Sequence, residues 1–100
     1  MATPSMPNPP RYQAAQKKIV IYTTTWCPYC IRAKRLLKSK GWEFTDIDVD
    51  GDHDKRAWLR KVSGQSTVPQ IFIGEESVGG YDEIAALDRV GELDRKVLGP

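Results

Sequence analysis

The sequence contains few of the residues on which several common kinds of protein depend. Two cysteines and one histidine are too few for a disulfide-rich scaffold or a protein-only zinc site, which needs four ligands. No apolar run is long enough to cross a bilayer. The net charge is only +2, and no basic stripe is interleaved with aromatic residues. We therefore expect a small globular domain that binds neither membrane nor nucleic acid and holds no metal.

The N-terminal segment differs in composition from the rest of the chain. Residues 1–17 contain four of the seven prolines and have no apolar core of the kind found in secretory signals. We predict a disordered Pro-rich tail over residues 1–17 and one folded domain over residues 18–100. Without an export signal we expect a cytoplasmic protein, and structural disulfides are rare in that compartment.

Short β-rich runs alternate with helical spacing along the predicted domain. Strands are predicted over residues 18–23 and 44–49, and two more lie within TVPQIFIGEESVGG (67–80), on either side of a turn near Gly74. A strand–helix–strand opening implies a right-handed crossover and a parallel pair. The last two strands are close enough in sequence for an antiparallel hairpin. The order βαβαββα thus predicts an α/β fold, with a four-stranded mixed sheet flanked by helices on both faces.

Three helices complete this pattern. The first begins at the cysteines and is expected to end at Gly41, where left-handed geometry is tolerated. The second is predicted over residues 52–62 and ends at Gly64. Its expected apolar contacts are Ala57, Leu59 and Val62. The last helix is expected to begin with Asp82 as its N-cap. Its predicted apolar positions are Ile84, Leu87 and Val90.

Both cysteines lie at the start of the first predicted helix, in TTTWCPYCIRAKRLL (23–37). Pro28 suits the first helical position, which places Cys27 at the helix N-terminus and Cys30 one turn inside, on the apolar face. The unpaired amides and the positive end of the helix dipole converge on Cys27 and favour its thiolate. The geometry assigns Cys27 as the attacking nucleophile and Cys30 as the resolving thiol.

Two other uses of a close cysteine pair compete with this interpretation. A structural disulfide across a two-residue gap would remove little entropy from the unfolded chain. A zinc site would lack ligands, because the single histidine, His53, lies in an acidic loop. A C-x-x-C motif that follows a strand in a βαβ pattern is typical of a redox pair, and the redox pair is favoured here.

Three motifs, in order and at compatible spacing, resemble the glutaredoxins, a branch of the thioredoxin fold. They are Cys-Pro-Tyr-Cys, Thr-Val-Pro and Gly-Gly-x-Asp. The resemblance implies a thioredoxin-like fold and a glutathione-dependent thiol–disulfide oxidoreductase, which reduces protein disulfides and glutathione mixed disulfides through Cys27 and Cys30. It implies glutathione as the reductant, disulfide-containing or glutathionylated proteins as partners, and a monomer.

The same resemblance implies a glutathione site beside the cysteines. Thr67 and Val68 would contact the cysteinyl part of glutathione, with Pro69 in the cis form. Asp82 would pair with the γ-glutamyl ammonium and Arg56 with the glycyl carboxylate. Glutathione carries two carboxylates and one ammonium, so a site with two positive poles and one negative pole suits it. The implied contacts are Tyr29, Arg56, Thr67, Val68, Pro69, Gly80, Tyr81 and Asp82.

Two positions depart from the usual family pattern. Many glutaredoxins have a lysine three residues before the nucleophile, where this chain has Thr24. The identity of the thiol therefore stays open, and TTTWC is also similar to the mycoredoxins, which use mycothiol. Trp26 precedes the nucleophile in some glutaredoxins that bridge a [2Fe–2S] cluster, although Pro28 usually accompanies members that do not. The remaining alternatives are a redoxin reduced by thioredoxin reductase, a cluster-bridged dimer, and an inert disulfide-stapled domain.

Overall fold

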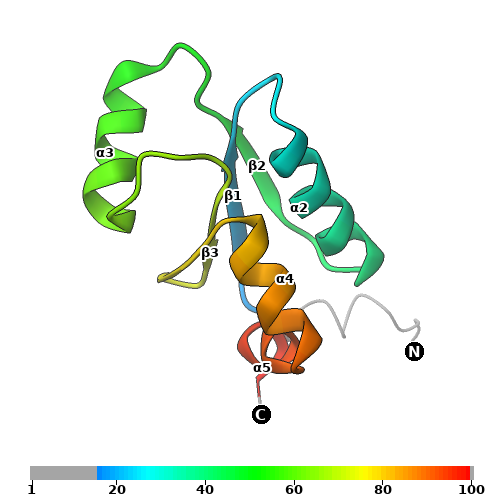
Figure 1. The fold of residues 1–100 in the computed structure, drawn as a ribbon. Helices are drawn as coiled ribbons and strands as arrows, with labels where there is room; N and C mark the ends of the chain where they lie inside the picture. Colours follow the sequence, from blue (N-terminus) through cyan, green and yellow to red (C-terminus); the bar gives the residue numbers. More distant parts are fainter. Residues whose placement is uncertain (1–15, 100) are drawn as a thin grey trace, which may run out of the picture.

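The structure, a computed structural model, describes residues 16–99, which form four strands and four helices (Figure 1). In chain order the elements are β1 (Ile19–Thr23), α2 (Pro28–Ser39), β2 (Thr45–Asp48), α3 (His53–Ser63), β3 (Gln70–Ile73), β4 (Glu76–Gly79), α4 (Tyr81–Arg89) and α5 (Glu92–Leu98). Within this part of the chain, no helix combines the length and the apolarity that crossing a membrane requires.

The predicted disordered tail lies outside the described residues, except for its last two positions. The Lys17 amide donates a hydrogen bond to the Val97 carbonyl at 2.9 Å. The side chain of Gln16 donates to the Glu43 carbonyl at 2.6 Å and accepts from the Glu43 amide at 3.1 Å. Contacts with the domain are thus already present at Gln16, ahead of the predicted boundary at residue 18.

The sheet has the strand order β2-β1-β3-β4. β1 pairs in parallel with β2 and antiparallel with β3, and β3 pairs antiparallel with β4. The predicted four-stranded mixed sheet is therefore confirmed, with the near-continuously apolar run IVIYT at a central position. Because β1 and β2 are parallel, their carboxyl ends lie at the same edge of the sheet, and the cysteines follow β1 at that edge.

Helices cover both faces of this sheet, with α3 on one side and α2 and α4 on the other (Figure 1). The face under α2, α4 and α5 is mainly aliphatic, and most of its side chains have almost no exposed surface. Its buried cluster consists of Ile19, Ile21, Ala33, Leu37, Trp42, Ile71, Ile73, Ile84, Leu93 and Val97. The face under α3 is aromatic: the Tyr22 ring meets Trp58 and Phe72 edge-on, each with a centroid distance of 5.6 Å.

The face that α3 turns toward the domain differs from the one predicted. Of the three expected apolar contacts only Leu59 is buried, because Ala57 is exposed and 44 % of Val62 is exposed. The inward face instead follows Arg56, Leu59 and Ser63, which share one side of the helix at three- and four-residue spacing. Two of these residues are polar, so a search for apolar periodicity does not detect the face.

The start of α4 also differs from the prediction. Asp82 lies in the first turn of the helix, and the N-cap is Gly80. The Gly80 amide donates to Glu83 Oε1 at 2.7 Å, so a side chain three residues ahead satisfies the helix end. This arrangement leaves the Asp82 carboxylate exposed at the surface instead of engaged in a cap.

A further helix, α5, was absent from the predicted order βαβαββα. It follows Gly91, which has a φ of 80°, a left-handed conformation that glycine adopts readily. Val90, expected to be an apolar contact of the last helix, ends α4 with 69 % of its surface exposed. With only seven residues, α5 buries just Leu93 and Val97, and two apolar positions give too weak a periodic signal for detection.

Leu59 is the buried apolar residue of α3, whereas Trp58 packs on the sheet with 45 % of its surface exposed. Replacing Leu59 by Ala should lower the free energy of unfolding by about 2–4 kcal/mol, because a buried leucine leaves a cavity. The matched substitution Val62→Ala, at a half-exposed position on the same helix, should lower it by less than about 1 kcal/mol. Chemical denaturation of the two variants measures the difference, and equal effects would contradict the inward face described above.

Candidate active site

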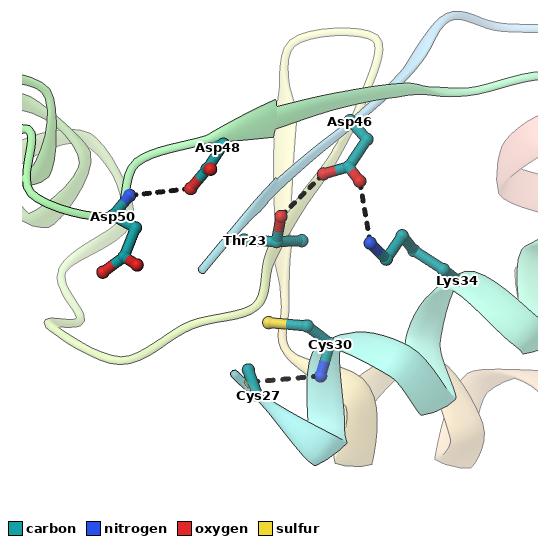
Figure 2. A network of polar contacts seen from close by, with 7 residues as sticks. All are labelled: Thr23, Cys27, Cys30, Lys34, Asp46, Asp48 and Asp50. Atoms are coloured by element: carbon teal, nitrogen blue, oxygen red, sulfur yellow. Dashed lines mark hydrogen bonds and ion pairs between the residues drawn. The ribbon is translucent and has the colours of Figure 1, made fainter. Parts of the chain in front are cut away.

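Cys27 is the N-cap residue of α2. Its backbone is extended, with φ −139°, and its sulfur accepts a hydrogen bond from the Cys30 amide at 3.1 Å (Figure 2). A sulfur thus occupies the position usually taken by a capping oxygen. The first turn of α2 contains no acidic residue, so no neighbour there opposes the helix dipole. The predicted placement of Cys27 at the helix N-terminus is confirmed, and this environment favours negative charge on the sulfur.

The other side of Cys27 faces the loop between α3 and β3. The Val68 carbonyl lies 3.8 Å from Cys27 Sγ and accepts a hydrogen bond from the thiol form. The Val68–Pro69 peptide bond is cis, as the resemblance implied. The Cys30 amide and the Val68 carbonyl favour opposite protonation states of the sulfur, and the amide is the closer of the two.

Cys30 lies one turn into α2 and has only 1 % of its surface exposed. Burial raises the pKa of its thiol to about 12, and the hydrogen bond and charge of Cys27 contribute in the same direction. The Thr24 backbone and the Lys34 ammonium oppose this shift only in part. Both cysteines are free thiols and both are buried, Cys27 with 8 % of its surface exposed and Cys30 with 1 %. The two sulfurs, three residues apart, differ in depth and in hydrogen bonding, because Cys27 accepts an amide hydrogen bond at the helix end and Cys30 lies one turn deeper.

A polar network lies beside Cys30 and connects α2 to β2 (Figure 2). Asp46 accepts from Lys34 Nζ at 2.8 Å and from the Thr23 hydroxyl at 2.7 Å. Partial burial alone would raise the pKa of the Asp46 carboxyl, but these contacts outweigh it and lower the pKa. The carboxylate partly neutralises Lys34, which limits the influence of this lysine on Cys30. Within residues 16–99, no group of three or more His, Cys, Asp or Glu side chains is arranged to hold a metal ion.

A groove of about 410 Å³ lies between the α3–β3 loop and the N-terminal end of α4. Its lining residues are Tyr29, Gln65, Thr67, Val68, Pro69, Gly80, Tyr81, Asp82 and Glu83. All of the glutathione contacts implied by the resemblance, except Arg56, therefore line one groove next to Cys27. A second hollow, of about 520 Å³ beside Tyr22 and Trp58, includes none of these residues and neither cysteine.

Arg56 does not line the groove. Its Nη2 donates to the Ser66 carbonyl at 3.2 Å, which connects α3 to the loop that forms one wall. Gln65 and Glu83 line the groove but were missed in the sequence. Glu83 stands three residues after the N-cap Gly80, the spacing of a capping box, and this signal could have identified it.

Aromatic side chains lie at the groove beside Cys27. The rings of Tyr29 and Tyr81 lie 6.4 Å apart at the groove, and the Arg32 guanidinium lies 5.3 Å from the Tyr29 ring centroid. Trp26, next to the nucleophile in sequence, has 92 % of its surface exposed. The site thus combines a sulfur at a helix end with a groove lined by two tyrosine rings and by the Asp82 carboxylate.

Comparisons with known proteins agree with this geometry. Residues 19–78 match the family model described as Glutaredoxin. The chain is 58 % identical to a glutaredoxin of Pseudomonas aeruginosa over 76 residues, which cover 76 % of this chain and 90 % of the relative. Its fold is similar to the solution structure of glutaredoxin from Brucella melitensis, with a TM-score of 0.77, 45 % identity, and coverage of 85 % of this chain and 92 % of the other. The crystal structure of a buckwheat glutaredoxin–glutathione complex matches with a TM-score of 0.74, 31 % identity, and coverage of 87 % and 81 %.

The contrast between the sulfurs predicts selective alkylation. At neutral pH iodoacetamide should modify Cys27 and leave Cys30 unmodified, because a thiol pKa of about 12 leaves almost no thiolate at Cys30. In the Cys27→Ser variant, Cys30 should still react at least about tenfold more slowly than in the same protein unfolded in urea, since burial is the largest cause of its shift. Mass spectrometry of quenched samples measures both rates. Equal rates for Cys30 in the folded and unfolded variant would contradict the described burial.

Proposed function

Because the chain belongs to the glutaredoxin family and has its thioredoxin-like fold, we propose that it is a glutathione-dependent thiol–disulfide oxidoreductase acting through Cys27 and Cys30. Family membership accounts for the thiol–disulfide chemistry. The observation that carries the proposal is the unequal placement of the two sulfurs. Cys27 accepts an amide hydrogen bond at the end of α2, whereas Cys30 is buried one turn deeper. Cys27 is suited to attack a disulfide, whereas Cys30 is suited to remain a thiol until the resolving step.

Reduction of a glutathione mixed disulfide needs Cys27 alone. Its thiolate attacks the glutathione sulfur, a Cys27–glutathione disulfide forms, and the substrate leaves as a thiolate that takes a proton from water. The thiolate of a second glutathione then attacks the bound glutathione sulfur. Glutathione disulfide leaves and Cys27 returns as the thiolate, so one free glutathione is consumed for each mixed disulfide that is reduced.

Reduction of a disulfide within a protein uses Cys30 as well. Cys27 first forms a mixed disulfide with one substrate sulfur, and the other substrate sulfur leaves. The hydrogen bond and charge of Cys27 both raise the pKa of Cys30. Both contributions end once Cys27 is in a disulfide, so Cys30 loses its proton more readily at the step that requires it. Cys30 then attacks Cys27 and releases the substrate thiol, and two glutathione molecules reduce the resulting Cys27–Cys30 disulfide.

The groove beside Cys27 supports glutathione as the thiol. One solved structure of similar fold is a glutaredoxin–glutathione complex. In this chain, all the residues that the resemblance implies as glutathione contacts, except Arg56, line one groove, and they come from three separate segments. The N-terminal amides of α4 suit the γ-glutamyl carboxylate and Asp82 suits its ammonium. Arg56 contacts Ser66 through one nitrogen, and its further donors suit the glycyl carboxylate. Thr24 replaces a charged contact by a neutral one, which predicts weaker binding than a lysine there would give.

Replacing Cys27 and replacing Cys30 should abolish different reactions. Cys27→Ser should abolish turnover of a small glutathione mixed disulfide, because no nucleophile remains. Cys30→Ser should keep most of that turnover and lose the reduction of an intramolecular protein disulfide. The assay couples glutathione and glutathione reductase to the oxidation of NADPH. Equal loss of mixed-disulfide turnover in both variants would overturn the assigned roles.

The same assay identifies the electron source. Glutathione with its reductase should support turnover, whereas mycothiol or thioredoxin reductase in its place should support much less. Faster turnover with mycothiol would indicate a mycoredoxin that uses mycothiol as its reductant. Faster turnover with thioredoxin reductase would indicate a redoxin that does not use glutathione.

Asp82 should contribute to substrate binding and not to the chemical step. Asp82→Asn should raise KM for a glutathione mixed disulfide by about three- to tenfold with little change in kcat, since an exposed charge pair contributes about 1 kcal/mol. Asp54→Asn, an exposed acid in the first turn of α3 outside the groove, is the matched control and should leave KM unchanged. An equal rise in both variants would point to net charge in place of a specific contact.

A further inference from the structure

Gln70 is a polar side chain with no exposed surface, at the first position of β3. Its Nε2 donates to Gln65 Oε1 at 2.9 Å and to the Thr67 carbonyl at 2.9 Å. A side-chain amide has two hydrogens, so both are used in contacts with the α3–β3 loop. Gln65 and Thr67 line the groove, whereas Gln70 lies behind it.

The orientation of the Gln70 amide follows from these contacts. The Thr67 carbonyl can only accept a hydrogen bond, so the nitrogen must face it. The Gln70 oxygen is then buried and has no partner among residues 16–99. A buried carbonyl oxygen without a partner is unfavourable, and an apolar side chain of similar volume would avoid it. Stability of the fold therefore does not account for a glutamine at this position.

The α3–β3 loop is positioned mainly through its carbonyl groups. From residue 65 to residue 67, every carbonyl accepts a hydrogen bond from a side chain of the surrounding structure, and the Val68 carbonyl accepts one from Cys27 when that residue is a thiol. The donor–carbonyl pairs are Ser63–Gln65 at 3.1 Å, Arg56–Ser66 at 3.2 Å, Gln70–Thr67 at 2.9 Å and Cys27–Val68 at 3.8 Å. Gln70 makes the shortest of these contacts and is the most deeply buried donor among them.

We propose that Gln70 is a positioning residue for the glutathione groove: from beneath the α3–β3 loop it fixes Thr67 and Gln65 in the orientation that the ligand meets. It does not touch the ligand or the reacting sulfurs. The proposal rests on the proposed function of the groove and names a determinant of its affinity. It also explains why an unpaired buried oxygen is tolerated, because the same amide orders two groove residues that no apolar side chain could hold.

Gln70→Leu separates this role from a structural one. The variant should raise KM for the mixed disulfide of cysteine and glutathione about tenfold, with kcat within about twofold, since a positioning hydrogen bond is lost and the nucleophile is unchanged. Its thermal midpoint should equal or exceed that of the wild type, because the unpaired oxygen is removed and the freed loop acceptors can turn to water. A single turnover of pre-reduced enzyme with bis(2-hydroxyethyl) disulfide, which contains no glutathione, should keep its wild-type rate.

A double-mutant cycle gives the second readout. Gln65→Ala removes one of the two acceptors at an exposed position and should raise KM less than Gln70→Leu does. In the Gln70→Leu background the Gln65→Ala change should add less than it does alone, because both act through the same hydrogen bond. If the effects of the two substitutions on KM were fully additive, the proposed role of the Gln70–Gln65 hydrogen bond would be overturned.

Two results would overturn the proposal itself. One is a wild-type KM in Gln70→Leu, and the other is loss of both reactions together with a lowered thermal midpoint, which would indicate a purely structural role. Failure of the proposed function has a different signature. In that case the wild-type enzyme reduces bis(2-hydroxyethyl) disulfide but does not turn over the glutathione mixed disulfide.

Discussion

The hydrogen bond from the Cys30 amide to the Cys27 sulfur is the contact on which the site depends. It exists because α2 begins at Pro28, and the helix begins there because its apolar face packs against the sheet through Ala33 and Leu37. The same packing draws Cys30 into the interior one turn later. A single helical turn thus favours negative charge on one sulfur and protonation of the other, and no further acid or base is required to distinguish them.

The rest of the domain forms a groove beside the Cys27 sulfur. β1 and β3 are adjacent, so the loop that precedes β3 passes beside the start of α2, and the Val68 carbonyl reaches Cys27. The start of α4 forms the opposite wall, with its helix end satisfied by Glu83. The groove is therefore assembled from segments that are far apart in sequence, and its shape depends on how well the α3–β3 loop is fixed.

Apolar periodicity and turn residues were sufficient to predict the sheet and the place of the cysteines. Buried polar contacts were not predictable, because a residue such as Gln70 finds partners only once the loop before β3 folds back over it. The inward face of α3 was missed for the same reason, since Arg56 and Ser63 make polar contacts there. The cis bond before Pro69 was expected only from the family resemblance. Local patterns thus predict the scaffold, and the groove emerges from tertiary contacts.

The most direct test of the account is the ultraviolet thiolate absorbance of the reduced protein at neutral pH. We predict that the thiolate signal of the wild type is retained in Cys30→Ser and lost in Cys27→Ser. Absence of a thiolate in the wild type, or a signal that persists without Cys27, would contradict the division of roles between the two sulfurs.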